Sequence, residues 1–350
     1  MRASCRATTT VAEPSTRQGR IFAAALSCGA LAAALTWSVQ ATAQGWKPDR
    51  NIDIVVSSGA GGAADRSART LQKFVQAMPG IPSVSVTNRP GGSGTVAWSF
   101  VNQHPGDAHY ISTLNTALVT NQIMGMSHLR YQDVTPLTIM MREYVAVWAR
   151  VESPIASAKD LIARLKRDPA SVSFGLSPAL GNQNHIVLGM LARAAGVDPR
   201  ALKVVVFSSG GAGMTAALGG HVDVWAGTAG SVLGHLPERK IRVIGMSAAD
   251  RQPGPFAEVA TFREQGVDAM YYAWRGYLGP RGLTPAQVAF WDDAFAKIVS
   301  SEAWQAELAR NAWGAEFKRS AETRKHLAAE HELLEKMLAD LGVLKRQSAP

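Results

Sequence analysis

The stretch IDIVVSSGAGGAAD, residues 52–65, decides the fold class. Its opening residues are mostly apolar and β-branched, which predicts a buried strand. The glycine-rich turn Gly59–Gly62 follows. Apolar residues then recur at helical spacing up to Met78, which predicts a helix over 64–78 that Pro79 ends. The stretch therefore predicts one strand–turn–helix unit.

The same alternation of strand and helix signals continues along the chain. Strands are expected at 84–86, 110–114, 171–176, 204–207, 222–225 and 241–246. Helices are expected at 160–166, from the polar loop 177–184 through Ala194, after the glycines at 210–211, and over most of the chain from 285 onward. This alternation indicates an α/β fold of mainly parallel sheets, in which ligands bind at loops beyond the carboxyl ends of the strands.

The N-terminal segment 1–43 has the features of a secretory signal peptide. A basic start precedes an apolar run over 21–35, and an Ala-Thr-Ala motif ends at Ala43, so we expect cleavage there and a periplasmic protein. A membrane anchor is the less favoured alternative, because the run is shorter than a bilayer span. The two cysteines of the sequence, Cys5 and Cys28, fall in this segment, so we expect no disulfide, thiol nucleophile or thiolate metal site in the mature chain.

The charge of the chain favours small anions over nucleic acid as partners. The formal net charge of +9 stays positive when the four arginines and one glutamate of the signal peptide are removed. A positive field raises the encounter rate with anions. The basic residues are dispersed, without a block of five or a basic helix interleaved with aromatics, so no nucleic-acid partner is expected.

Two glycine-rich loops, 57–65 and 208–213, each leave a strand and open a helix. Glycine lets the backbone approach a ligand closely, and the free N–H groups and dipole of the first helical turn favour an anion. Serine hydroxyls add further donors. Two such loops at equivalent strand ends predict a carboxylate or a diacid held between them. The alternative is that both are tight turns in which glycine serves packing.

Enzymatic interpretations are weaker. Gly59, Gly61 and Ala64 fit a dinucleotide fingerprint, but the second strand ends without an acidic residue for a ribose, although Arg89 would suit a 2′-phosphate. Nicotinamide cofactors are not expected outside the cytoplasm. The sequence contains no G-x-S-x-G, H-E-x-x-H or Walker motif, and His104 and His109, which flank Asp107, are interpreted as exposed rather than as metal ligands. We therefore expect no catalytic residues, no cofactor and no metal.

Two acidic residues and a tryptophan near these loops have structural interpretations. Asp65 and Asp223 are expected to accept hydrogen bonds from loop amides, since an acid in an anion site would repel the ligand. Trp225 shares a strand face with Asp223 and is either a core residue or a wall of the cleft.

Further motifs occur in order along the chain and resemble those of the tripartite tricarboxylate transporter substrate-binding proteins, also called the Bug family. They are Gly61-Gly62-x-x-Asp65 with Arg69, Asn88 to Gly94, the Tyr131–Pro136 segment, His185, Leu218 to Asp223, Glu264-Gln265-Gly266, and Trp274, Gly276 and Pro280. The resemblance covers the chain from Trp46 to about Leu344.

This resemblance implies a type II periplasmic-binding-protein fold, with two α/β lobes, a ligand cleft and a twice-crossed hinge. Lobe 1 is then expected at 44–147 and 276–345, lobe 2 at 148–275, and a disordered tail at 346–350. Family members bind di- and tricarboxylates, acidic amino acids or aromatic acids and deliver them to a membrane permease. The alternative to transport is that the receptor presents its ligand to a two-component sensor kinase. A less favoured alternative is an NAD(P)-dependent oxidoreductase. The chain is expected to be a monomer.

The expected ligand-binding residues lie on strand-end loops of both lobes. They are Ser57, Ser58, Gly61, Gly62, Ala63, Asp65, Asn115 and Thr116 in lobe 1, and Ser177, Asn182, Asn184, His185, Ser208, Gly210 and Asp223 in lobe 2. The chain departs from the family at residues 57–60, where prolines and an aromatic residue are usual, and at Ala226, where phenylalanine is common. These departures point to a more polar or roomier pocket.

Overall fold

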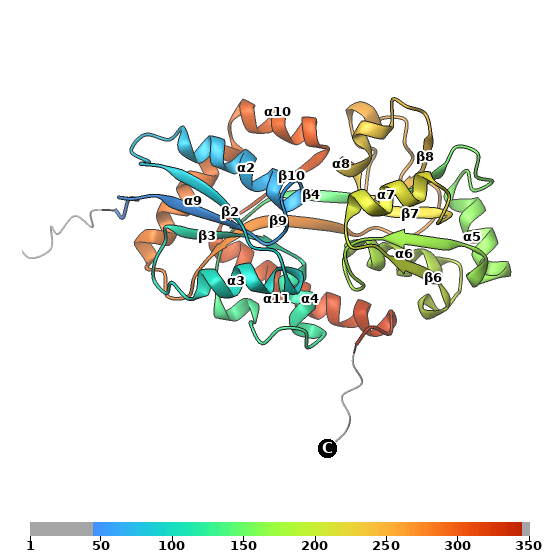
Figure 1. The fold of residues 1–350 in the computed structure, drawn as a ribbon, viewed down its shortest axis with the longest axis horizontal. Coiled ribbons are helices and arrows are strands. Elements are labelled where there is room, and N and C mark those ends of the chain that lie inside the picture. The colour runs from blue at the N-terminus through green and yellow to red at the C-terminus, as the bar shows by residue number, and fades with distance from the viewer. Residues whose placement is uncertain (1–44, 345–350) are drawn as a thin grey trace, which may run out of the picture. The chain divides into compact units, whose positions relative to one another are not determined.

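Two neighbouring antiparallel strands, β4 (Thr135–Arg150) and β9 (Tyr272–Gly279), run through the centre of the fold (Figure 1). The strand order is β2-β1-β3-β9-β4-β7-β5-β6, and β8 and β10 also pair with β4. The other strands are β1 (Ile52–Val56), β2 (Val84–Asn88), β3 (Tyr110–Asn115), β5 (Ser173–Leu176), β6 (Lys203–Val206), β7 (Val224–Thr228), β8 (Ile241–Met246) and β10 (Trp313–Lys318). The computed structural model describes residues 45–344. The predicted signal peptide with its cysteines and the predicted tail at 346–350 lie outside this range.

The long strand β4 changes its partners midway, and this change divides the structure into two lobes. Up to Tyr144, β4 pairs with β9 and β10, and from Val145 it pairs with β7 and β8. The last pair on the first side joins Tyr144 to Tyr272, and the first pair on the second side joins Val145 to Thr228. Lobe 1 therefore holds β1, β2, β3, β9 and β10, and lobe 2 holds β5 to β8. The chain crosses between the lobes along β4 and returns into β9 (Figure 1).

Helices cover the sheet in both lobes. Those of lobe 1 are α2 (Ala63–Gln76), α3 (Thr95–Asn102), α4 (Ala117–Ile123), α9 (Pro285–Val299), α10 (Glu302–Asn311) and α11 (Ser320–Asp340). Those of lobe 2 are α5 (Ala158–Arg167), α6 (Gln183–Ala194), α7 (Gly210–Leu218) and α8 (Ala229–Val232). Single 3-10 turns lie at Gly92–Gly94, Tyr131–Asp133, Pro169–Ser171, Pro199–Ala201, Leu233–His235 and Gly254–Phe256. None of the helices within residues 45–344 is long and apolar enough to cross a membrane.

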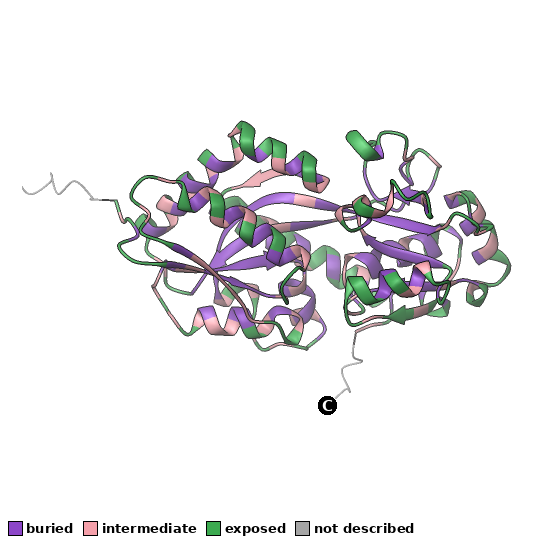
Figure 2. Ribbon diagram, turned by 45° about the horizontal axis from the view of Figure 1, so that its top comes forward, coloured by how far each residue is buried: buried purple, intermediate pink, exposed green. Residues whose placement is uncertain are grey.

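The strands form the core, and the helices expose their outer sides (Figure 2). One face of the lobe 1 sheet packs against α2, α9 and α10, and the other against α3, α4 and α11. Side chains such as Ile52, Ile54 and Val56 are fully buried beneath α2. Burial of each such side chain stabilises the fold by about 1.5–3 kcal/mol, so the strand-end loops stand on a rigid base.

The C-terminal helix α11 reaches from lobe 1 to lobe 2. Its first residue, Ser320, donates a hydrogen bond to the backbone oxygen of Pro136 at the start of β4. At the other end, Asp340 forms an ion pair with Arg193 of α6 at 2.6 Å. Leu341 packs so closely on α6 that a β-carbon at Gly189 would stand 2.2 Å from it. The final turns of α11 therefore contact lobe 2 although the helix begins in lobe 1.

The predicted fold class, an α/β protein with two lobes, is confirmed, and each predicted strand matches an observed strand within a few residues. The expectation of mainly parallel sheets is corrected, because β4, β8, β9 and β10 pair antiparallel. The expectation of a mostly helical C-terminal region missed β10, which separates α10 from α11. Pairing with strands far along the chain decides these elements, so local patterns did not reveal them.

Candidate ligand-binding site

The strand-end loops of lobe 1 lie at the edge of its sheet that borders the crossover. The crossover is the point between Tyr144 and Val145 where β4 passes from lobe 1 to lobe 2. At its carboxyl end, β3 pairs Asn115 with Arg275 of β9, three residues from the crossover pair of Tyr272 with Tyr144. β1 runs parallel to β3, so its own carboxyl end and the following loop at 57–62 lie at the same edge. The helices α2 and α4 begin at that edge.

The loops of lobe 2 are directed towards the same crossover. β7 ends at Thr228, which pairs with Val145 of β4 immediately after the crossover. β5 and β6 run parallel to β7 and to each other, so the loops after Leu176 and Val206 share this edge. The two predicted glycine-rich loops thus lie at edges of the two lobes that both border the crossover.

In the first loop, Ser57 is joined to the end of β3. The Ser57 N–H donates to Thr113 Oγ1 at 3.0 Å, and the two hydroxyl oxygens also lie 3.0 Å apart. The Asn115 side-chain amide donates to Ser57 Oγ at 3.4 Å. The structure therefore brings together Ser57 and Asn115, two of the predicted site residues, as neutral polar groups at one edge.

Asp65 is buried and supports the first loop. Its carboxylate accepts hydrogen bonds from the Gly61 N–H at 2.8 Å, from Asn88 Nδ2 at 2.9 Å and from Arg69 Nε at 3.0 Å. Burial opposes ionisation, but these hydrogen bonds outweigh it and hold the pKa of Asp65 below its usual range. Asp65 is thus a positioning residue, and its partner Gly61 takes a φ of +75° that suits glycine.

The N-terminus of α2 is partly exposed. Its N-cap residue, Gly62, supplies no side-chain cap. Gly61 is exposed, and Ser58, Gly62 and Ala63 are half-buried. At the neighbouring α4, Thr116 is buried, and its hydroxyl has no hydrogen-bond partner within the described part of the chain. An uncapped helix start leaves N–H groups that an anion can accept from.

In lobe 2, the loop before α6 is held by its own amide side chains. Asn182 caps α6 by accepting from the N–H groups of Asn184 and His185 at 3.0 and 3.1 Å. The side-chain amides of Asn182 and Asn184 both donate to the backbone oxygen of Ser177, at 2.7 and 3.3 Å. Both side-chain amides therefore donate within the loop and shape it.

His185 is buried and neutral. Its Nδ1 accepts a hydrogen bond from the Gly181 N–H at 3.1 Å, which leaves Nε2 as the protonated nitrogen. Burial lowers the pKa of His185 to about 4. A ligand would meet an uncharged imidazole here.

The second glycine-rich loop is exposed and lies beside Ser177. The hydroxyl of Ser209 caps α7 by accepting from the Ala212 N–H at 3.2 Å. Ser208 and Gly210 are exposed, and a β-carbon at Gly210 would stand 3.7 Å from Ser177 Oγ. Ser177, Ser208 and Gly210 thus form one accessible edge of lobe 2.

Asp223 is not brought together with these loops. It precedes β7, and its Oδ2 accepts hydrogen bonds from the N–H and hydroxyl of Ser173, at 2.8 and 2.6 Å, where β5 begins. Both positions are amino ends of parallel strands, at the opposite edge from the loops after Leu176 and Thr228. Asp223 therefore links two strands far from the crossover.

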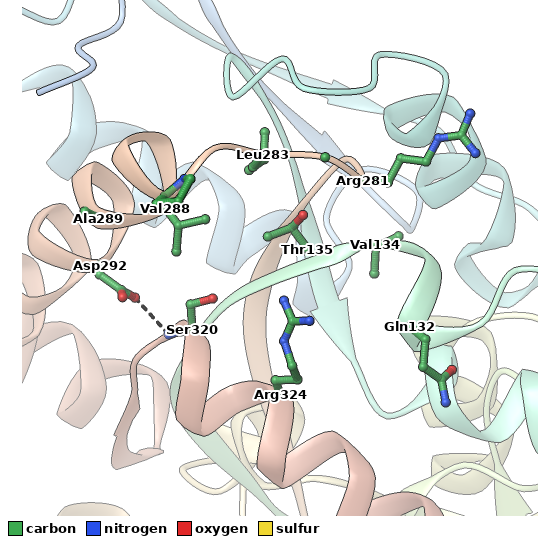
Figure 3. A pocket seen from close by; sticks show the side chains of 12 residues that line it. Gln132, Val134, Thr135, Arg281, Leu283, Val288, Ala289, Asp292, Ser320 and Arg324 are labelled. Carbon is green, nitrogen blue, oxygen red and sulfur yellow. Dashed lines mark hydrogen bonds between the residues drawn. The ribbon is translucent and has the colours of Figure 1, made fainter. Parts of the chain in front are cut away.

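Two adjoining cavities of about 510 and 530 Å³ lie elsewhere in lobe 1, at the far end of the β4–β9 ladder. The first is lined by residues that include Leu283, Asp292 and Arg324. Figure 3 shows Arg324 reaching into this cavity and Asp292 turned towards Ser320. The carboxylate of Asp292 accepts a hydrogen bond from the Ser320 N–H at 2.8 Å. None of the predicted ligand-binding residues lines either cavity.

Sequence patterns missed a charged pair near the strand-end loops. Arg275 of β9 donates through Nε to Glu143 Oε2 of β4 at 2.6 Å, and Trp313 Nε1 of β10 donates to Glu143 Oε1 at 3.2 Å. Glu143 is a charged residue inside a mostly apolar run, and that contrast was the available signal. Among residues 45–344, no group of three or more His, Cys, Asp or Glu residues is arranged to hold a metal.

Two α/β lobes that are joined by β4 and by the segment leading into β9, with strand-end loops bordering the crossover in both, define the class of two-lobed solute-binding proteins. Within that class, the chain belongs to the tripartite tricarboxylate transporter receptor family, TctC, whose sequence profile matches residues 67–343. Protein BugT of Bordetella pertussis is 24% identical over 261 residues, covering 73% of this chain and 78% of BugT.

Solved structures agree in fold. R. palustris Rpa4515 with adipate has a TM-score of 0.76 at 23% identity, covering 84% of this chain and 98% of that one. MatC from Rhodopseudomonas palustris with bound malate has a TM-score of 0.68 at 21% identity, covering 85% and 100%. The predicted family resemblance and fold are thereby confirmed.

Proposed function

We propose that this chain is a non-enzymatic periplasmic receptor that captures a small carboxylate between its two lobes. The observation that carries the proposal is the common direction of the loops: those after β1 and β3 in lobe 1, and after β5 and β6 in lobe 2, all border the crossover. Membership of a transporter receptor family supports this reading. The predicted signal peptide, cleaved after Ala43, would deliver the chain to the periplasm.

The proposed ligand class follows from the chemistry of these loops. The uncapped start of α2 offers backbone N–H groups, and Ser57, Ser58, Asn115 and Ser208 add neutral polar groups. Backbone amides at a helix start favour carboxylates over neutral or cationic ligands. The relatives that hold adipate and malate are consistent with a di- or tricarboxylate. In this proposal, Asp65, Asn182 and Asn184 support the loops. Asp223 is not part of the proposed site, because it lies at the opposite edge of the lobe 2 sheet.

The lobes would close on the ligand by bending at the crossover. Within residues 45–344, only β4 and the segment leading into β9 join the two sheets, and the β4 partners change between Tyr144 and Val145. Bending there would bring the two loop-bearing edges together and exclude water. We retain the predicted division into 44–147 with 276–345 and 148–275 as a proposal, with the end of α11 in contact with lobe 2.

A thermal-shift screen of the purified protein tests the ligand class. Malate, adipate and citrate are compared with glucose and with calcium chloride. A ligand that binds only the folded state at 100 times its Kd stabilises it by about 2.7 kcal/mol, so at least one acid should raise the midpoint by several degrees. A shift with glucose or calcium and none with any acid would contradict the proposal.

The proposed partner is the membrane permease of a tripartite transporter, and the chain would act as a monomer. Uptake of the labelled acid by cells that lack this protein separates the permease from a sensor kinase. Lost uptake supports the permease. Unchanged uptake with a lost transcriptional response to the acid would instead assign the receptor to a sensor kinase.

A further inference from the structure

Three neighbouring strands carry a row of interacting polar side chains close to the crossover. Glu143 of β4 pairs with Arg275 of β9, whose Nε and Nη2 lie 2.6 and 2.5 Å from Glu143 Oε2. Trp313 Nε1 of β10 donates a hydrogen bond to the other carboxylate oxygen, Glu143 Oε1. The side chain of Glu143 is 2% exposed and that of Arg275 is 11% exposed. The carboxylate is thus fixed from both sides, and it in turn fixes the guanidinium.

The register places Arg275 beside the proposed ligand donors. Arg275 lies directly opposite Asn115, and residues directly opposite each other on antiparallel strands point to the same face of the sheet. Asn115 reaches Ser57 Oγ from that face. The guanidinium therefore lies on the same side of the sheet as the first loop, at the edge that borders the crossover.

The guanidinium keeps one nitrogen available. Nε and Nη2 face Glu143, whereas Nη1 has no hydrogen-bond partner in the described part of the chain and is not among its buried, unpaired atoms. A guanidinium presents five N–H donors in a planar fork, so the Nη1 group can donate to a second carboxylate while the pair with Glu143 stays intact.

We infer that Arg275 is a specificity-determining residue that binds a second carboxylate of the ligand and so selects diacids over monoacids. The inference rests on the proposed function and deepens it. The loops offer neutral donors, which suit one carboxylate, and Arg275 adds a fixed positive charge with a directed donor. Charge-assisted hydrogen bonds are about twice as strong as neutral ones, so a diacid gains an interaction that its half-amide lacks.

Isothermal titration calorimetry with diacids and their half-amides tests this inference. Succinate is compared with succinamate and adipate with adipamate, because each half-amide keeps the length of the diacid and loses one charge. The wild type should prefer at least one diacid over its half-amide by about tenfold or more, which corresponds to one charge-assisted hydrogen bond. Equal affinity of the wild type for each diacid and its half-amide overturns the inference while leaving the proposed function standing. Binding of no carboxylate by the wild type overturns the proposed function itself.

The double variant Arg275→Met with Glu143→Gln removes the charge without leaving an unpaired carboxylate buried, and glutamine still accepts from Trp313. It should lose most of the diacid preference, about tenfold, while half-amide binding changes less than about twofold. A purely structural role of the pair would weaken diacid and half-amide equally, and that result overturns the inference.

Two further variants complete the test. Arg281→Met removes an exposed arginine at the far end of lobe 1, where it lines the two cavities, and should leave the diacid preference unchanged. Arg275→Lys keeps the charge without the fork and should keep part of the preference. If the double variant fails to show a cooperative thermal transition, Arg275→Lys decides alone, and a preference equal to that of the wild type would refute the directed hydrogen bond.

Discussion

Gly213 of α7 lies directly against the indole ring of Trp225 of β7. A β-carbon at residue 213 would stand 1.8 Å from the ring, and Trp225 itself is 2% exposed. The same ring also covers Gly175 of β5. Trp225 is therefore a core residue rather than a wall of the cleft, and its close packing sets how near α7 sits to the sheet.

The variant Gly213→Ala should destabilise the protein by about 1–3 kcal/mol, because the added methyl group forces Trp225 or α7 to shift. Urea unfolding followed by tryptophan fluorescence measures the change. Gly211→Ala is the matched control in the same helix, since nothing lies within 4 Å of its β-carbon position. That change should be neutral or stabilising by up to about 1 kcal/mol, through the higher helix propensity of alanine. Equal effects of the two changes would rule out the steric explanation.

The variant Asp65→Asn should alter the acid stability of the protein. The pKa of Asp65 lies below its unfolded value of about 3.9, so its contribution is fully present above about pH 5 and is lost as the pH falls through the lower folded-state pKa. The variant should lose about 1–3 kcal/mol at pH 7, because three hydrogen bonds to a buried carboxylate are weakened. Its stability should also depend less on pH between 5 and 3.

The control for Asp65 is Asp223→Asn, which changes the same chemical group at the far edge of lobe 2. Asp223 also accepts two hydrogen bonds, both from Ser173. Titration calorimetry with the carboxylate that gives the largest thermal shift compares the two variants. Asp65→Asn should weaken binding, since the loop at 57–62 loses its support, whereas Asp223→Asn should leave affinity within about twofold of the wild type. The reverse pattern would show that the site lies elsewhere.

Local sequence patterns located most strands and the loops that follow them. The run at 52–57 and the glycines after it form a self-contained signal, because β-branched residues favour strands and glycines open the turn before a helix. The strand positions 110–114 and 241–246 were predicted for the same reason and lie within β3 and β8. Predictions based on neighbouring residues therefore succeeded where neighbouring residues decide the structure.

Strands β4, β9 and β10 were not predicted, because the strands with which they pair are distant in sequence. β4 pairs with β9 more than 120 residues later, and β10 joins β4 from the C-terminal region. Arg275 and Glu143 lie on these strands, so their pairing could not be inferred from spacing. Asn182 and Asn184 stay predicted ligand contacts, and the spacing of residues could not show that both side chains also bond to Ser177 within their own loop. Which way a polar side chain turns depends on local geometry that residue type does not specify.

The variant Ser208→Asp should weaken carboxylate binding by about tenfold or more, because it places a negative charge on the exposed loop beside Ser177 and Gly210. Titration calorimetry at low ionic strength measures the effect, which should decrease with added salt. Ala321→Asp is the control, an exposed position in the first turn of α11 that changes the net charge by the same amount. Equal losses in both variants would attribute the effect to net charge rather than to the loop.

The buried imidazole of His185 predicts a loss of stability in mild acid. Burial lowers its pKa to about 4, against about 6.5 in the unfolded chain. A histidine with a lowered folded pKa contributes its full stability above the unfolded pKa, and this contribution is lost as the pH falls from 6.5 towards 4. The free energy of unfolding should therefore fall by about 2 kcal/mol between pH 7.5 and pH 5 from this residue. In His185→Asn, where the amide oxygen can still accept from the Gly181 N–H, this part of the pH dependence should vanish. Replacement of the exposed His128 by asparagine should leave the profile unchanged, and an identical profile in both variants would show that another group causes the acid sensitivity.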